Sequence, residues 1–441
     1  MESNRIIPKG ILFPFVLLTT LFFAWAVPNN LTDTMLAAFK RIMSISDSKT
    51  AWIQVVCYLL GYGCCAIPGA LFIKRYTYKS GVMLGLGLYA FGALLFYPAM
   101  LCSEINIEFS FFMYLLAIFV LFAGLSVLET STNSYVLAIG PENTATRRLN
   151  LSQAFNPFGA ITGVVISQIF ILSQLNMMTA SERSQLPANE LAAIQGQELN
   201  AVTTAYVVLG LVMLVLLVAI WLTKMPNLSE KGEKVEFGAT FRRLIKNKNY
   251  VWGVVAQFFY VGAQIMCWTF IIQYGTRYFM SEGMEEKAAE VLSQQYNIVA
   301  MIIFCASRFI CTFILRYLSP GLLLKVLAIA ACFFTTGVIG FQDIWGMYCL
   351  VGVSACMSLM FPTIYGIALQ GLGDDAKFGA AGLIMAILGG SVLPPVQASI
   401  IDCGTLLGMP AVNLSFILPF ICFVVIVIYG HRSYCREKMR K

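Results

Sequence analysis

The chain has 441 residues, of which 59% are hydrophobic and only 12% are charged, and its mean hydropathy is +0.78. Since a soluble domain is roughly a quarter charged, this composition excludes an ordinary soluble protein. The formal net charge is +7. We attribute that charge to membrane topology and expect no nucleic-acid partner, because the basic residues gather in alternate loops.

Apolar segments of about 20 residues, the length that crosses a roughly 30 Å hydrocarbon core as a helix, recur along the whole chain. They predict twelve helices, near residues 11–37, 51–73, 80–101, 109–138, 151–176, 200–223, 249–275, 293–315, 322–341, 345–371, 378–401 and 410–430. Only helices and closed barrels satisfy the backbone in lipid, and segments this continuously apolar exclude a barrel. The expected fold class is therefore an all-α integral membrane protein.

The basic residues predict the orientation. With both termini inside, the inner segments carry 22 of the 29 Lys and Arg residues and the outer loops carry 6. This asymmetry follows the positive-inside rule and predicts a multi-pass protein with both termini in the cytoplasm. The first apolar segment is too long for a signal peptide and is followed by no small-residue cleavage pattern, so we expect a retained helix.

The longest inner loop predicts the domain organisation. It spans residues 224–248 and separates an N-terminal six-helix half, 1–223, from a C-terminal half with a basic tail, 249–441. A faint repeat supports two related halves, because Ile-x-Arg-Tyr ends the second and the eighth helix, at residues 73–76 and 314–317. Twelve helices in two parallel-related halves are typical of the major facilitator superfamily of transporters.

The residues that hold metals and catalyse reactions are sparse. His431 is the only histidine, and the 13 cysteines are scattered mostly within apolar segments. We therefore expect no metal site, no disulfide framework and no histidine proton relay. Nucleotide motifs, paired histidines and clustered acids are also lacking, so we expect no cofactor and no enzyme.

Two carboxylates lie within predicted membrane helices, Asp33 in the first and Glu129 in the fourth. A charged side chain in the bilayer costs several kcal/mol, so such residues are rare and usually functional. Removal from water favours the protonated form of a carboxyl group, which is the property that proton coupling requires. Asn30 shares the region of Asp33, and Pro28 can mark a broken helix beside a substrate.

Amides, aromatics and one arginine form the candidate sugar site. Amides donate and accept hydrogen bonds, as sugar hydroxyls require, and an aromatic face suits the apolar face of a pyranose. The candidate substrate-binding residues are Asn30, Glu129, Gln153, Asn156, Gln264, Trp268, Tyr365 and Arg308. Gln153 and Asn156 are expected to be i, i+3 neighbours on one helix.

Two parts of this site have a second interpretation. Gln264 and Trp268 belong to a helical stripe with Gln257 and Tyr260, and such stripes more often serve packing. Arg308 either binds a helix-end carbonyl or a carboxylate, or it contacts the substrate.

Several runs of sequence resemble one family. They are Phe22-Phe23-Ala24-Trp25-Ala26-Val27-Pro28-Asn29-Asn30-Leu31-Thr32-Asp33, Leu128-Glu129-Thr130, Phe155-Asn156-Pro157-Phe158-Gly159 and Tyr260-Val261-Gly262-Ala263-Gln264-Ile265-Met266-Cys267-Trp268. Over nearly the whole chain, the sequence is similar to the L-fucose/proton symporters of the major facilitator superfamily. The resemblance implies that Asp33 and Glu129 act in proton translocation and sugar recognition, and that Asn156 lines the sugar cavity. It also implies a bacterial inner membrane protein, for which we expect a monomer.

The expected function is thus proton-coupled import of L-fucose or a related hexose by alternating access. Pro28, Ser131 and Pro157 depart from the residues usual in the family. The wider family includes glucose and galactose carriers, so the sugar stays open. The alternatives are a facilitator or sodium-coupled carrier of the same fold, a multidrug/proton antiporter, and a membrane-embedded enzyme.

Overall fold

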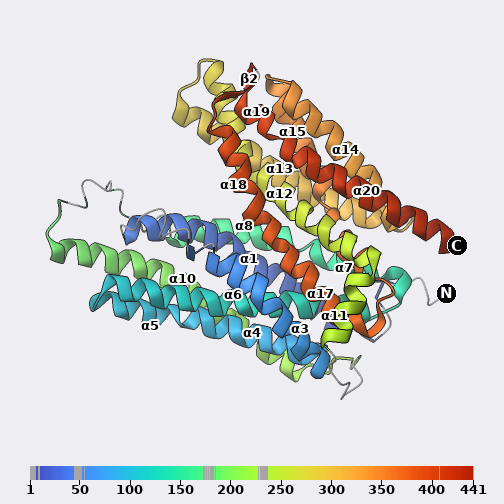
Figure 1. The fold of residues 1–441 in the computed structure, drawn as a ribbon. Helices are drawn as coiled ribbons and strands as arrows, with labels where there is room; N and C mark the ends of the chain where they lie inside the picture. Colours follow the sequence, from blue (N-terminus) through green and yellow to red (C-terminus); the bar gives the residue numbers. More distant parts are fainter. Residues whose placement is uncertain are drawn as a thin grey trace. The chain divides into compact units, whose positions relative to one another are not determined.

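The structure is a computed structural model of the chain. It describes residues 6–7, 10–43, 52–53, 55–171, 185–226, 237–406 and 408–440, with isolated positions at 174, 176, 178, 183 and 228. Within the first helix, the side chains of Asn30 and Asp33 fall outside the described part. Figure 1 shows the helices coloured along the sequence.

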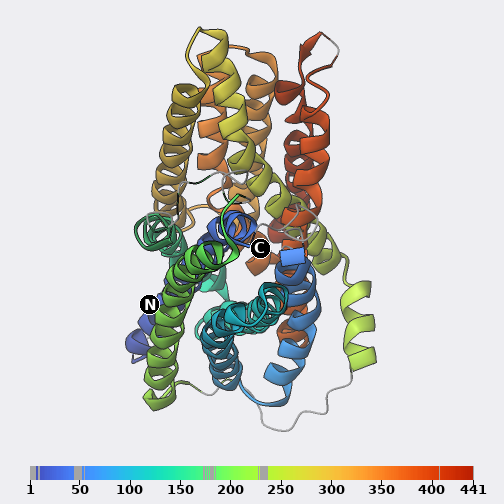
Figure 2. The same ribbon diagram turned by 90° about the vertical axis from the view of Figure 1, so that its left-hand side faces the viewer.

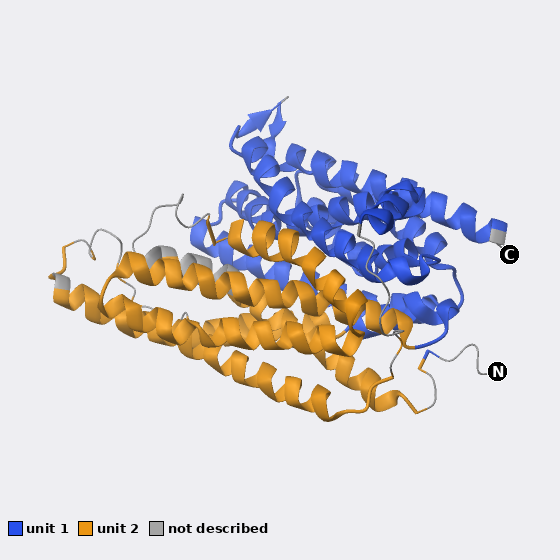
Figure 3. Ribbon diagram, turned by 60° about the horizontal axis from the view of Figure 1, so that its bottom comes forward, with its two compact units in different colours: residues 1–6, 140–154, 236–441 blue, residues 7–139, 155–235 orange. Residues whose placement is uncertain are grey.

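The chain forms two compact units, coloured separately in Figure 3. Unit 2 comprises residues 7–139 and 155–235, and unit 1 comprises residues 1–6, 140–154 and 236–441. The halves expected from the sequence were continuous, 1–223 and 249–441, whereas the units are not. The stretch 140–154, however, packs in unit 1 although it precedes the linker.

Unit 2 is built from long helices that lie side by side, notably α4 with α6 and α1 with α8. Its elements are α1 (Leu12–Ile42), the π-helix η2 (Val55–Cys64), α3 (Cys65–Arg75), α4 (Tyr78–Leu94), α5 (Phe96–Leu101), η3 (Cys102–Glu104), α6 (Ile107–Ala138), α8 (Asn156–Ile166), η5 (Ser167–Ile171) and α10 (Ala188–Leu222). The contact of α1 with α8 depends on Gly159 and Gly163, because a Cβ at either position would strike a backbone carbonyl of α1.

Unit 1 packs α14 against α15 and α20, and Figure 1 shows α14 and α20 running side by side. Figure 2 shows the same ribbon turned by 90°. Its elements are η4 (Glu142–Thr144), α7 (Ala145–Gln153), α11 (Phe237–Lys246), α12 (Lys248–Ser281), α13 (Glu286–Ile314), α14 (Pro320–Gly340), α15 (Ile344–Met357), α16 (Met360–Leu369), η7 (Gly373–Asp375), α17 (Ala376–Met385), η8 (Ala386–Leu388), α18 (Gly389–Ile401), the hairpin β1 (Thr405–Leu406) and β2 (Met409–Pro410), α19 (Ala411–Ser415) and α20 (Ile417–Arg440).

In the described part of the chain, twelve helical segments are long and apolar enough to cross a membrane. They confirm the predicted spans in number and order. The largest difference is the sixth, which begins near Asn189 rather than 200 because α10 is one helix that extends beyond the apolar segment. Buried Glu198 holds this extension, accepting hydrogen bonds from Arg183 at 2.5 and 2.8 Å.

Proline interrupts some spans and not others. The first span continues through Pro28 as a single helix, α1, without the break that a proline can cause. The fifth span is divided instead, since α7 ends at Gln153 and α8 begins at Asn156. Likewise, the tenth is divided between α15 and α16.

Candidate functional site

The deep carboxylate of unit 2 has a partner that the sequence analysis missed. Glu129 lies on α6, is 6% exposed, and accepts a hydrogen bond from the Tyr62 hydroxyl at 2.8 Å. Tyr62 lies on the π-helix η2 and in turn accepts from the Asn29 amide at 3.5 Å. The three side chains form a chain of polar groups from α1 through η2 to α6. A π-helical turn is a frequent mark of a functional site.

Three polar residues that follow Glu129 form hydrogen bonds with backbone carbonyls of α6. Thr130 and Ser131 donate to the carbonyls of Ser126 and Val127 at 2.7 and 2.6 Å. The Asn133 amide donates to the Glu129 carbonyl at 2.9 Å. Such bonds satisfy the hydroxyl groups locally. Tyr62, rather than this cluster, therefore provides the hydrogen bond to the Glu129 carboxylate.

The fifth span does not have the geometry expected for its two amides. Gln153 is the last residue of α7 and Asn156 is the first of α8, so they do not share one continuous helix as i, i+3 neighbours. Gln153 is buried in unit 1. Asn156, in unit 2, is half-buried and donates to the Phe22 carbonyl of α1 at 3.2 Å.

The stripe on α12 divides into a buried part and a partly exposed part. Gln257 and Tyr260 are fully buried in unit 1, and the Tyr260 hydroxyl donates to the Met357 carbonyl at 3.1 Å. Gln264 and Trp268 are half-buried. The Trp268 Nε1 donates to the Ser354 hydroxyl at 3.2 Å, which fixes the ring against α15. Gln257 and Tyr260 thus pack inside unit 1, whereas Gln264 and Trp268 are not completely covered.

Aromatic rings extend from Trp268 to the deep arginine. The Trp268 ring packs edge-on against Phe304, with ring centroids 4.9 Å apart. The Arg308 guanidinium lies over the other ring of this pair, 4.6 Å from the Phe304 centroid. Tyr365 is fully buried in α16, with its ring parallel to that of Phe361 at 6.3 Å.

Arg308 is 4% exposed and bonds to backbone carbonyls. Its Nε donates to the Ser358 carbonyl at 2.6 Å, and its Nη1 donates to the Gln153 carbonyl at 2.9 Å. Of the two structural interpretations, the helix-end carbonyl is the one present, since no acidic side chain in the described part of the chain pairs with this guanidinium.

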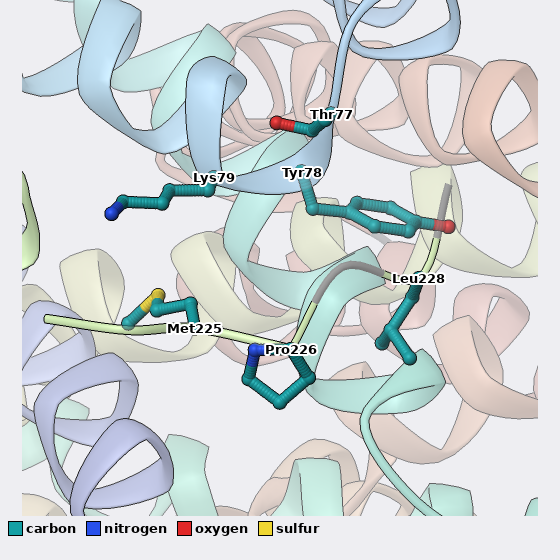
Figure 4. Close-up of a pocket in the computed structure, with 6 residues that line it drawn as sticks. All are labelled: Thr77, Tyr78, Lys79, Met225, Pro226 and Leu228. Atoms are coloured by element: carbon teal, nitrogen blue, oxygen red, sulfur yellow. The ribbon is translucent and has the colours of Figure 1, made fainter. Parts of the chain in front are cut away.

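Unit 2 contains a small cavity of about 200 Å³ whose lining includes none of these residues (Figure 4). It is lined by Thr77, Tyr78, Lys79, Met225, Pro226 and Leu228. Lys79 Nζ donates to the Trp221 and Thr223 carbonyls, each at 2.9 Å. A cation at the end of α10 satisfies carbonyls that the helix leaves unpaired. We interpret this cluster as an anchor for the segment after α10 rather than as a solute site.

The described residues contain no group of three or more His, Cys, Asp or Glu side chains placed to hold a metal ion. Unit 2 thus holds the deep carboxylate of Glu129, and unit 1 holds the deep guanidinium of Arg308 with amides and aromatic rings. These groups lie on helices that are long and apolar enough to cross a membrane. These are the features of a secondary transporter with polar binding groups at membrane depth.

The comparisons with known proteins agree with this class. Residues 13–395 match the Major Facilitator Superfamily, and the chain belongs to this family of transporters. It is 44% identical over 440 residues to the L-fucose-proton symporter of Haemophilus influenzae, covering 98% of this chain and 99% of the relative. It is 34% identical to the L-fucose-proton symporter of Escherichia coli, covering 96% and 93%.

A solved structure has the same fold. The transporter FucP, crystallised in the outward conformation, superposes with a TM-score of 0.85 and 32% sequence identity. The match covers 96% of this chain and 99% of that chain. The family and the fold expected from the sequence are thus confirmed.

Proposed function

We propose that this chain is a proton-coupled monosaccharide symporter that imports L-fucose. The observation that carries the proposal is the buried Glu129 carboxylate, bonded to Tyr62 inside a membrane helix of a chain similar over nearly its full length to L-fucose-proton symporters. A protein that uses a proton gradient needs such a group, which can bind and release a proton within the membrane.

Asp33 and Glu129 are the proposed proton-coupling residues. When Glu129 is ionised, the Tyr62 hydroxyl donates to its carboxylate; protonation removes the charge and with it the cost of burying the charge. Sugar binding and proton binding are linked if the sugar hydroxyls bond to the same carboxyl group. Asp33, four residues after Asn29 on α1, is proposed to exchange protons with the outside.

Seven of the residues chosen from the sequence are proposed to bind the sugar: Asn30, Glu129, Gln153, Asn156, Gln264, Trp268 and Tyr365. The eighth, Arg308, is left out because its guanidinium bonds to the Ser358 and Gln153 carbonyls. Within unit 1, Gln264 and Trp268 have the strongest support, because both are half-buried and the ring is held by its bond to Ser354. An aromatic face beside an amide can stack on a pyranose ring and bond to its hydroxyls. Tyr365 is fully buried and has weaker support.

The cellular setting is part of the proposal. The distribution of Lys and Arg favours both termini in the cytoplasm. The similarity to L-fucose-proton symporters of bacteria supports an inner membrane location. A monomer is expected, with L-fucose and protons as its solutes and the lipid bilayer as its surroundings.

Counterflow in proteoliposomes tests the substrate. Labelled L-fucose should accumulate in vesicles that are preloaded with unlabelled L-fucose, and D-galactose and D-glucose should compete less well. Added L-fucose should also make the medium of unbuffered vesicles more alkaline, because a proton enters with each transport cycle. Preference for glucose or galactose would favour the alternative carrier. Sugar-driven acidification would favour an antiporter, and no change in pH a facilitator or sodium-coupled carrier.

A further inference from the structure

Both carbonyls that Arg308 binds are ones that a proline deprives of a helical donor. In an α-helix, the carbonyl of residue i accepts from the N–H of residue i+4. Residue 157, four after Gln153, is proline, and so is residue 362, four after Ser358. Proline has no N–H, so neither carbonyl can accept the α-helical hydrogen bond from residue i+4. Arg308 donates to one at 2.9 Å and to the other at 2.6 Å.

The two bonds lie where the fifth and the tenth spans are interrupted. Gln153 is the last residue of α7, and Ser358 follows the last residue of α15. The carbonyls at a helix C-terminus carry a partial negative charge, which favours a cation there. A guanidinium suits this position because its planar fork presents several N–H groups in fixed directions.

Other side chains hold the end of α15 in the same way. The Ser307 hydroxyl donates to the Ala355 carbonyl at 2.8 Å, and the Tyr260 hydroxyl donates to the Met357 carbonyl at 3.1 Å. Three carbonyls at this helix end, those of Ala355, Met357 and Ser358, thus accept from side chains of α12 and α13. We call Ser307, Tyr260, Arg308 and the carbonyls that they bind the junction. Of these three side chains, Arg308 also bonds to α7, at the Gln153 carbonyl.

We propose that Arg308 is a positioning residue that supplies the hydrogen bonds missing at Pro157 and Pro362, and so fixes the end of α7 to the interruption between α15 and α16. Its effect on transport is indirect: the junction sets the places of Gln153 on α7 and of Trp268, which is bonded to α15. The transport readout rests on the proposed function, but the stability readout does not.

The test is a set of variants in two backgrounds. Arg308→Met keeps much of the side-chain length and removes every donor. In the natural background it should lower the apparent melting temperature in detergent and reduce L-fucose counterflow about tenfold or more, as expected when buried acceptors lose their donors. In a Pro157→Ala/Pro362→Ala background, both carbonyls regain a backbone donor. In this background, Arg308→Met should reduce L-fucose counterflow less than about threefold. The two carbonyls then no longer depend on the guanidinium, so the effects of the substitutions are not additive.

Pro394→Ala is the matched control. It restores a donor inside α18, whose carbonyls are not among the two that Arg308 binds, so it should not rescue Arg308→Met. If Arg308 contacted the sugar directly, the apparent KM would rise equally in every background, and this result would overturn the proposal. Full stability and transport in Arg308→Met alone would also overturn it.

Arg308→Lys decides the case in which the Met variant does not fold in either background. Lysine keeps the charge on one compact ammonium, which lacks the fork that reaches two carbonyls. Arg308→Lys should lower the melting temperature less than Arg308→Met does, and this decrease should be smaller when either proline is replaced. An equal decrease with and without the prolines would contradict the proposal. If the natural protein moved no L-fucose, the proposed function would fail while the melting data still tested the role of Arg308.

Discussion

Glu129 and Arg308 are deep charges of the two units, and their surroundings differ. In unit 2, α6 runs unbroken past Glu129, and the carboxylate accepts a hydrogen bond from Tyr62. In unit 1, two interrupted spans present carbonyls to Arg308. A carboxyl group can lose its charge by binding a proton, whereas a guanidinium stays charged in proteins. The permanent charge is therefore matched by permanent backbone acceptors, and the switchable charge by a single hydroxyl.

Glu129→Gln breaks the comparison most directly, because it removes the switchable charge and nearly preserves the shape. We expect uphill, pH-driven uptake of L-fucose to be abolished while exchange of sugar across the membrane continues. Two assays in proteoliposomes measure this: pH-driven accumulation of L-fucose, and counterflow of labelled L-fucose without a pH gradient. Glu108→Gln is the control, since this residue lies in the exposed first turn of the same helix. Full pH-driven accumulation by Glu129→Gln would remove this residue from the coupling mechanism.

Gln264→Ala tests whether unit 1, which holds the permanent charge of Arg308, also contributes a hydrogen bond to the sugar. Loss of a hydrogen bond that leaves a partner unmade costs about 1–3 kcal/mol, so sugar affinity should fall roughly 5- to 150-fold. Gln257→Leu is the control on the same helix. Gln257 is fully buried, and in the described part of the chain its amide has no hydrogen-bond partner, so calorimetry should show unchanged affinity. Equal losses in both variants would indicate a general effect on α12.

Gly159→Ala tests the packing of unit 2, where the contact of α1 with α8 depends on small residues. The added Cβ would strike the Phe23 carbonyl of α1. Overpacking of this kind typically costs about 1–3 kcal/mol, so the melting temperature in detergent should fall. Gly196→Ala, where a Cβ meets nothing within 4 Å, should leave stability unchanged or raise it. Equal melting temperatures for the two variants would mean that α1 and α8 can separate without cost.

The sequence was sufficient to predict the membrane spans, because hydropathy over about 20 residues is set by the bilayer itself. It was insufficient to predict where a span breaks. Pro28 was the proline singled out, yet α1 continues through it, whereas the spans containing Pro157 and Pro362 are interrupted. The difference lies in tertiary partners: at the latter two prolines, Arg308 satisfies the orphaned carbonyls, and its position in a different helix is invisible to local sequence patterns.

The candidate site was predicted in the same uneven way. Glu129 was found because a charge in an apolar segment is conspicuous. Tyr62 was missed, because a tyrosine in an apolar helix carries no such signal and only the fold brings it to Glu129. The stripe on α12 was recognised, but its division between buried Gln257 and half-buried Gln264 depends on which neighbouring helix covers each turn.

The assignment of α7 to unit 1 has a consequence for splitting the protein into fragments. A cut in the linker after α10 would leave α7 on the first fragment. Three of its bonding partners, the Thr312 carbonyl, the Thr363 hydroxyl and the Arg308 guanidinium, would lie on the second. The first fragment would then carry α7, and the second would carry these partners. Each fragment made alone would expose the polar groups that pair in the whole protein. Co-expression from two genes should consequently give a functional carrier, because the helix that joins the pieces is already built into the fold.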